Sequence, residues 1–306
     1  MRWDDFRRSD NVEDRTGDSG GGGGFPLGGG IKLGGGALVV VVIASFIFGV
    51  NPLEMIGMIE GSGPVGPSPS QSQAPPGYGP QQNPTPGQQR PSTTQKDPSK
   101  DHVAAVLGDT EDVWRAVFQA MGARYEPPRL VMFHGTTKPS ACGRVSSATG
   151  PFYCSADREL YLDTAFFAEL SQRFGAPGDF AQAYVIAHEV GHHVQNLTGT
   201  MQKFEQQMQR LDTRGRSALS VNLELQADCY AGVWGYFAQR RNKLDPGDVE
   251  QGFRAAAAVG DDQIQKRTQG YVAPETFTHG SAEQRLRWFK TGLESGDMRK
   301  CNTFGT

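Results

Sequence analysis

Residues 187–193 read Ala-His-Glu-Val-Gly-His-His and contain the pattern His-Glu-x-x-His. Residues four apart lie on the same face of an α-helix, so His188 and His192 can bind one metal ion together. Between them, Glu189 lies where its carboxylate can accept a proton from a water molecule that the metal activates. The stretch therefore predicts a helix that carries a catalytic metal site.

A catalytic zinc ion usually has three protein ligands and keeps its fourth position for water or substrate. A third histidine six residues after the second would extend the motif, but Gln195 and Thr198 occupy the glycine and histidine positions of that longer pattern. The other common third ligand is a glutamate from a later helix, and residues 224–228 read Glu-Leu-Gln-Ala-Asp. We predict that Glu224 is the third ligand and that Asp228, one turn further on, accepts the second ring N–H of a ligating histidine.

An alternative interpretation makes these two carboxylates solvated charges on a helix surface. The small residues Ala227, Ala231 and Gly232 leave their helix narrow, which suits close packing against Gly191 of the motif helix. A glycine in a helix interior costs about 1 kcal/mol relative to alanine, and such packing would explain it. The pattern favours the ligand interpretation.

Apolar residues are unevenly distributed along this chain of 306 residues, and we expect the folded domain to span residues 101–306. Short apolar runs at 130–133 and 160–163 predict strands. Apolar residues at helical spacing predict several helices, so the expected fold class is α+β, mainly helical and zincin-like, with a small sheet. The helices are expected to begin at Asp109 or Thr110 and at Asp179, and to span 166–174, 222–239 and 281–294.

The N-terminal third is predicted to have three parts. Residues 1–32 are charged and then glycine-rich, which is typical of a disordered tail. Residues 33–53 carry no charge and are long enough to cross a bilayer as a helix, so we expect a membrane anchor. A cleaved signal peptide is the alternative, but the preceding tail is long and no small-x-small site follows the apolar run. Residues 54–100 are rich in Pro, Gly, Ser and Gln and are expected to be a linker; proline-rich ligand motifs are the alternative.

Basic residues predict the orientation of the anchor. Arg2, Arg7, Arg8, Arg15 and Lys32 precede it, whereas no Lys or Arg follows it until residue 90. The positive-inside rule then predicts a cytoplasmic N-terminus and an extracytoplasmic catalytic domain.

The four cysteines lie beyond the apolar segment and are candidates for disulfide bonds. Cys142 and Cys154 would close a loop rich in Gly, Ser and Thr, and Cys229 and Cys301 remain as a second pair. A structural zinc site is an alternative, but the chain has no Cys-x-x-Cys pattern. Free buried thiols are another, with Cys229 the better candidate.

The remaining histidines and the net charge narrow the function. His193 is expected to face away from the metal, since it lies about 100° around the helix from its neighbour. His102 and His134 are expected at the surface or in loops. With a net charge of −3 and no basic cluster, the sequence gives no support to nucleic-acid binding.

The chain resembles the membrane-anchored bacterial neutral zinc metallopeptidases, which are related to the glutamate-type zincins. The resemblance rests on the motif helix and on residues 1–3, 9–14, 150–154, 224–228 and 278–281. It implies a single-span N-terminal anchor and a zincin domain. It also implies that Zn²⁺ is bound by His188, His192 and Glu224, and that Glu189 is catalytic.

Residues 278–285 resemble the segment with a histidine and a downstream arginine that follows the Glu-x-x-x-Asp helix in related membrane-associated zincins. This resemblance makes His279 a candidate donor to the oxyanion of the reaction intermediate, and an N-capping loop residue is the alternative. The expected function is a membrane-anchored zinc metalloendopeptidase that hydrolyses protein or peptide substrates. The alternative is a catalytically silent zinc-containing scaffold or binding module at the cell envelope.

Overall fold

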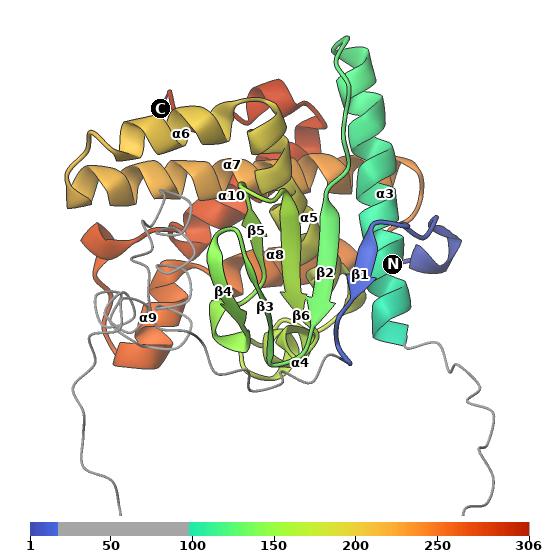
Figure 1. Ribbon diagram of the computed structural model, residues 1–306, viewed down its shortest axis with the longest axis horizontal. Helices are drawn as coiled ribbons and strands as arrows, with labels where there is room; N and C mark the ends of the chain where they lie inside the picture. The colour runs from blue at the N-terminus through green and yellow to red at the C-terminus, as the bar shows by residue number, and fades with distance from the viewer. Residues whose placement is uncertain (18–97, 306) are drawn as a thin grey trace, which may run out of the picture.

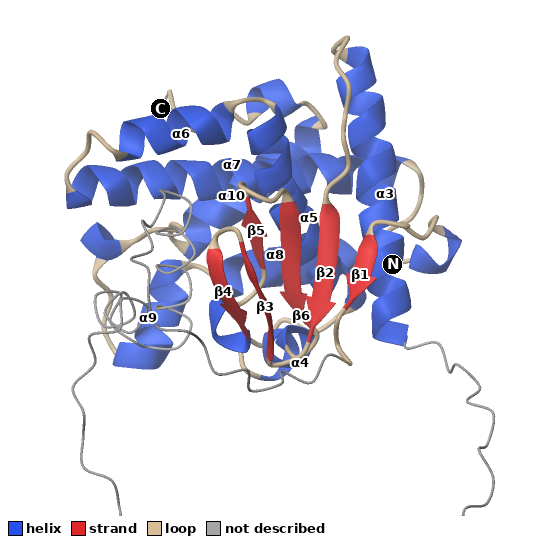
Figure 2. Cartoon of the chain, in the orientation of Figure 1, coloured by secondary structure: helices blue, strands red, loops and turns tan. Residues whose placement is uncertain are grey.

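The computed structural model describes residues 1–17 and 98–305, which form a mixed α and β structure in which helices predominate. One four-stranded sheet has the order β1-β2-β6-β5, and a hairpin pairs β3 with β4 (Figure 2). The predicted α+β class, mainly helical with a small sheet, is confirmed, and so are the strands at 130–133 and 160–163. The strands are β1 (Val12–Asp14), β2 (Arg129–Phe133), β3 (Thr136–Ser140), β4 (Gly143–Ser146), β5 (Phe152–Cys154) and β6 (Glu159–Asp163).

The helices predicted from the motif and from apolar spacing are present, with shifted ends. Helix α7 begins at Thr213, more than two turns before the predicted start, because the Asp212 side chain accepts a hydrogen bond from the Gly215 N–H and caps the helix there. The α-helices are α3 (Pro98–Ala120), α4 (Phe166–Gln172), α5 (Asp179–Leu197), α6 (Thr200–Met208), α7 (Thr213–Arg240), α8 (Asp248–Ala258), α9 (Asp261–Gln269) and α10 (Ala282–Ser295); short 3₁₀ turns are η1 (Trp3–Asp5), η2 (Ser147–Thr149), η3 (Pro274–Thr276) and η4 (Met298–Lys300).

The first long helix starts earlier than predicted. Helix α3 begins at Pro98, within the predicted linker, and not at Asp109 or Thr110. A proline fits the first turn of a helix because its missing N–H would have no partner there. Asp109 lies inside the helix, where its carboxylate binds the Arg241 guanidinium at 2.7 Å and the Trp234 indole N–H at 2.8 Å. Its polar side chain serves a tertiary contact and not a cap.

The two faces of the sheet are covered differently. Leu130 and Met132 of β2 lie opposite Leu160 and Leu162 of β6, and all four belong to the main core with the helices. The intervening residues, including Val131, point to the other face and pack in a smaller cluster with the hairpin. Alternation along the strands thus buries both faces, and the face toward the helices holds α5 in place (Figure 1).

The N-terminal segment, residues 1–17, is part of this fold and not a disordered tail. Strand β1 pairs in parallel with β2, with Val12 opposite Leu130. Phe6 is buried, and the Arg8 guanidinium binds the Asp101 carboxylate of α3 at 2.6 Å. Figure 1 shows β1 as the edge strand of the sheet beside α3, with η1 on the far side of that helix. The prediction of disorder is therefore wrong for residues 1–17, because contacts with residues about a hundred positions away order a segment that looks polar by itself.

A glycine marks where this segment crosses α3. A Cβ atom built on Gly108 would lie 2.2 Å from the backbone oxygen of Arg7. Only glycine allows this approach, so its cost in a helix interior has a structural reason. One turn on, the buried Glu111 carboxylate accepts hydrogen bonds from Ser9, Asn11 and Arg7 at 2.6–2.8 Å. Helix α3 thus binds the segment through a close backbone contact at Gly108 and through the negative charge of Glu111.

The predicted anchor and most of the predicted linker, residues 33–53 and 54–97, lie outside the described residues. Among the residues that are described, no helix is long and apolar enough to cross a membrane. The pairing of β1 with β2 nevertheless bears on orientation, because it joins residues 1–17 and 98–305 in one folded unit. A cytoplasmic N-terminus with an extracytoplasmic domain would place β1 and β2 on opposite sides of a membrane, and this orientation stays a prediction.

Candidate metal centre

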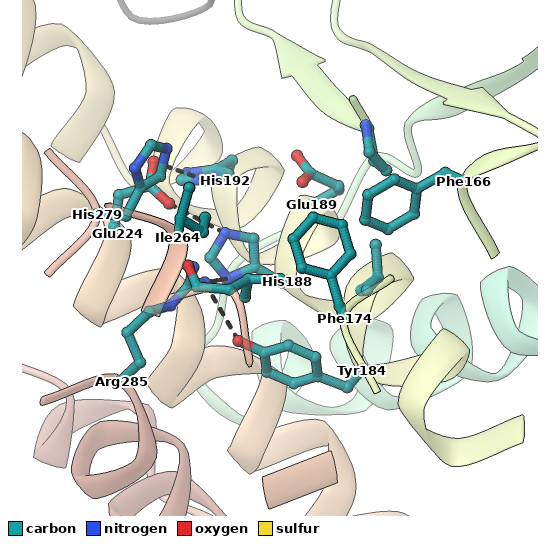
Figure 3. Close-up of a pocket in the computed structure, with 13 residues that line it drawn as sticks. Phe166, Phe174, Tyr184, His188, Glu189, His192, Glu224, Ile264, His279 and Arg285 are labelled. Atoms are coloured by element: carbon teal, nitrogen blue, oxygen red, sulfur yellow. Dashed lines mark hydrogen bonds and ion pairs between the residues drawn. The ribbon is translucent and has the colours of Figure 1, made fainter. Parts of the chain in front are cut away.

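Three buried side chains from two helices lie close together. His188 and His192 come from α5 and Glu224 from α7, and all three are buried. The His188 Nε2 atom lies 3.1 Å from one Glu224 oxygen, and the His192 Nε2 atom lies 3.4 Å from the other (Figure 3). A tetrahedral zinc ion with bonds of about 2.0–2.1 Å places neighbouring ligand atoms roughly 3.3 Å apart. The donor set therefore fits zinc in both chemistry and spacing.

Close helix packing brings these residues together. A Cβ atom on Gly191 would lie 2.9 Å from the backbone oxygen of Ala227, so α5 and α7 approach as the sequence predicted. Gly232 does not take part in that approach. Its hypothetical Cβ would lie 2.1 Å from the Phe289 oxygen of α10, and one on Gly292 would lie 1.9 Å from the Cys229 oxygen. Glycines thus set two crossings of α7, and the second brings α10 to the metal centre.

The ring of His188 is held by Asp228, as predicted. The Nδ1 atom lies 2.9 Å from an Asp228 oxygen, which leaves Nε2 facing Glu224. The same carboxylate accepts hydrogen bonds from the Tyr184 hydroxyl at 2.5 Å and from the Arg285 Nε–H at 2.8 Å. All of these groups are buried. A carboxylate held this firmly fixes the orientation of the ring and increases its basicity.

The ring of His192 is held by a residue that the sequence did not reveal as part of the site. The Gln195 side-chain oxygen lies 2.9 Å from His192 Nδ1, and its amide N–H group donates to the Leu223 carbonyl at 2.7 Å. That second bond orients the amide so that its oxygen faces the ring. Gln195 lies three residues after His192 on α5, so helical spacing was the available signal.

The charges of the centre favour a cation. Burial by itself lowers the pKa of His188, but the Asp228 and Glu224 carboxylates outweigh burial and raise it to about 10. Burial also raises the pKa of Glu224, yet His192 and His188 together bring it well below its usual range. Two carboxylates thus hold a proton on His188 at neutral pH. A metal ion would take over that positive charge, since a ligating imidazole must be neutral.

Glu189 lines a cavity of about 80 Å³ together with the three candidate ligands. Figure 3 shows its carboxyl group pointing toward the side where the histidines lie, with the rings of Phe166 and Phe174 close to the same side chain. Burial raises the pKa of this carboxyl, against the opposing effect of the nearby histidines. A raised pKa suits a group that takes up a proton and releases it again near neutral pH.

His279 lines the same cavity from the loop before α10. It does not cap that helix, because Ser281 does so through a capping box with Gln284. The His279 Nδ1 atom lies 2.9 Å from Asp261, whose other oxygen accepts the backbone N–H groups of Thr278 and His279, both at 2.7 Å. Burial lowers the pKa of His279, but Asp261 outweighs it, so the net shift is upward. Asp261, which the sequence did not reveal, thus holds the His279 ring at Nδ1 beside the cavity.

The other predicted residues have clear places. Cys142 is bonded to Cys154 and Cys229 to Cys301, so the disulfide interpretation is confirmed and the four-cysteine zinc site and free thiols are excluded. His193 faces away from the donor set, as predicted, and its ring nitrogens contact Tyr153 and Glu126. His134 is exposed. The expectation for His102 is wrong: it is buried on α3, with the Trp3 ring against it.

A buried set of two histidines from His-Glu-x-x-His and one glutamate from a second helix is a donor set of catalytic zinc sites in peptidases. The comparisons with known proteins agree with this class. The family described as "Putative neutral zinc metallopeptidase" matches residues 1–304, and the chain belongs to this family. The match includes the N-terminal segment as well as the metal centre.

Several relatives cover much or all of the chain. The Escherichia coli (strain K12) protein named "Uncharacterized protein YpfJ" is 43% identical over 313 residues, which cover 100% of this chain and 99% of the relative. The Mycobacterium tuberculosis (strain H37Rv) protein named "Uncharacterized protein Rv2575" is 43% identical over 213 residues, or 66% of this chain and 69% of the relative. No solved structure matches this chain.

Proposed function

We propose that this protein is a zinc metalloendopeptidase that hydrolyses peptide bonds in protein or peptide substrates. The observation that carries the proposal is the buried set of His188, His192 and Glu224 with Glu189 beside it in one cavity. The family description supports it. A purely structural zinc site has no use for an extra buried carboxyl group, so Glu189 argues against a silent scaffold.

His188, His192 and Glu224 would hold the zinc ion, and Asp228 and Gln195 would keep the two rings in position. When bound, zinc supplies a Lewis acid that polarises a carbonyl and lowers the pKa of water. The oxygen of the attacking water bonds to the carbonyl carbon of the substrate, and Glu189 accepts the proton that this water releases. The carbon–nitrogen bond then breaks, and Glu189 passes the proton to the leaving amine.

His279 has a separate task in this proposal. Its ring is fixed by Asp261 at Nδ1, so its Nε2–H is available to donate to the oxygen that gains negative charge as the peptide carbonyl is attacked. The upward shift of its pKa favours the protonated ring that this donation requires. Loss of one such donor typically slows turnover by about 100- to 1000-fold.

We also propose that the folded unit is extracytoplasmic and associated with the membrane. Two disulfide bonds support an oxidising compartment, because thiols are kept reduced in the cytosol. The apolar sequence of residues 33–53 supports membrane association. In this proposal the N-terminal segment lies on the same side as the domain.

The experiment compares the purified full chain with a Glu189→Gln variant on a mixed peptide library, with zinc content measured for both. We expect about one zinc per chain in each protein and cleavage by the unchanged chain alone, because glutamine cannot accept the proton. A Glu283→Gln variant, changed at an exposed position of α10, should cleave normally. Equal cleavage by both proteins, or none by either despite bound zinc, would overturn the enzymatic proposal.

A further inference from the structure

The cavity beside the metal centre has two chemically different walls. The polar wall consists of the candidate ligands, Glu189, His279 and Arg285, and the last of these is already bound to Asp228. Apart from Tyr184, whose hydroxyl is bound to Asp228, the other lining residues are apolar, and we call them the apolar wall. They are Pro151, Phe166, Phe174, Val185, Val259 and Ile264, and Figure 3 shows Ile264 on the side of His279 and Glu224, across from Phe166.

Elements distant in the sequence build this apolar wall. Phe166 comes from α4 and Ile264 from α9, while Val185 lies one turn before Glu189 on the same face of α5. Figure 3 shows the rings of Phe166 and Phe174 next to the Glu189 carboxyl group. A group seated against these side chains would therefore lie beside the carboxylate that handles the proton.

The wall is firmly held. The Phe166 and Phe174 ring centroids are 6.4 Å apart, and the Arg267 guanidinium covers the Phe174 ring at 5.2 Å. Phe166, Phe174, Val185 and Ile264 are each at most 9% exposed. A rigid apolar wall of this kind binds by excluding water from the group it receives, so it selects for apolar area and against charge.

We propose that this wall is a substrate subsite that receives one large apolar side chain, such as Phe, Leu or Met, from a residue directly next to the scissile bond. The inference rests on the proposed peptidase function. A cavity of about 80 Å³ has room for several water molecules, or for one side chain in their place. A carboxylate or an ammonium group there would lose its water without gaining a partner from the wall.

Peptide substrates varied at both residues flanking the scissile bond test the proposal. We expect kcat/KM to be at least about 100-fold higher for Phe, Leu or Met than for Asp or Lys at one of these positions. Phe174→Ala opens the wall and should shift the preference toward larger side chains, whereas Ile264→Phe narrows the cavity and should shift it toward Ala. Phe237→Ala, a change of a partly buried phenylalanine outside the cavity, should leave the preference unchanged.

A binding measurement separates this inference from the proposed function. Calorimetry on the Glu189→Gln variant should show binding of an apolar peptide that is weakened about tenfold or more when its large residue is replaced by Asp. Cleavage with no apolar preference at either position would overturn the subsite and leave the peptidase standing. Absence of all cleavage would overturn the peptidase, and the binding result would then decide on the subsite alone.

Discussion

The metal centre and the N-terminal segment, residues 1–17, show how differently a sequence reveals two parts of one fold. The centre combines the short helical motif with Glu224, 32 or more residues further on, and chemistry demanded each of those residue types. The N-terminal segment contains no such pattern, yet it supplies the edge strand of the sheet and binds the buried Glu111. A group of residues with a shared chemical role can be predicted from the sequence, whereas a contact surface between distant segments cannot.

The largest expected effect concerns the side of the membrane on which each region lies. Single cysteines introduced at the exposed positions Asp10 and Gln239 should react alike with an impermeant thiol reagent in intact cells, because β1 and β2 share one sheet. The four native cysteines are paired in disulfides and should not compete under non-reducing conditions. Lysed cells give the total labelling. Reaction at only one of the two positions would contradict the conclusion that residues 1–17 and 98–305 form one folded unit.

The contact between Glu111 and the N-terminal segment should contribute a large fraction of the free energy of unfolding. A Glu111→Gln substitution replaces an acceptor by a donor that faces Arg7 or Ser9, so we expect the free energy of unfolding to fall by about 2–3 kcal/mol. Urea titration measures this change. The matched variant Asp112→Asn alters the neighbouring, 45% exposed carboxylate and should cost under about 1 kcal/mol. Equal losses would mean that Glu111 does not secure the segment.

The sequence predicted which residues lie together at the candidate metal centre, because each group there meets a chemical requirement. Two imidazoles, a third ligand and a carboxylate behind a ring are needed by any such site, and Gly191 signalled the helix approach. Gln195 and Asp261 were not predicted as parts of the site, because glutamine and aspartate side chains have many different roles in proteins. The place of the N-terminal segment in the fold was not predicted for a similar reason. Gly108 and the acidic Glu111, both inside one apolar helix face, were the features that indicated a segment packed against that helix.

A substitution of Gln195 tests whether its contact with His192, which only the structure revealed, contributes to zinc affinity. A Gln195→Ala substitution removes the acceptor at His192 Nδ1 and should weaken zinc binding about tenfold. Competition with a zinc chelator measures the affinity, and Gln239→Ala, at an exposed position on α7, is the control. Unchanged affinity would show that His192 is oriented without Gln195.

The smallest expected effect is a dependence on pH that belongs to the N-terminal segment. Burial raises the pKa of Glu111, but hydrogen bonds from Ser9, Asn11 and Arg7 outweigh burial and lower it below its ordinary value of 4.5. A lowered folded-state pKa means that the stabilisation is complete above the unfolded-state value and is lost as the pH falls through the folded-state value. The stability difference between the unchanged chain and Glu111→Gln should therefore shrink between about pH 7 and about pH 3. A constant or growing difference would contradict this.

X-ray absorption spectroscopy at the zinc edge tests the central claim most directly. For the purified full chain loaded with one equivalent of zinc, we predict only nitrogen and oxygen neighbours at about 2.0–2.2 Å, with the scattering signature of two imidazoles. A Glu224→Ala variant should lose the metal or show one protein oxygen fewer. Sulfur neighbours at about 2.3 Å, or a spectrum without imidazole, would place zinc elsewhere and contradict the assignment of His188, His192 and Glu224.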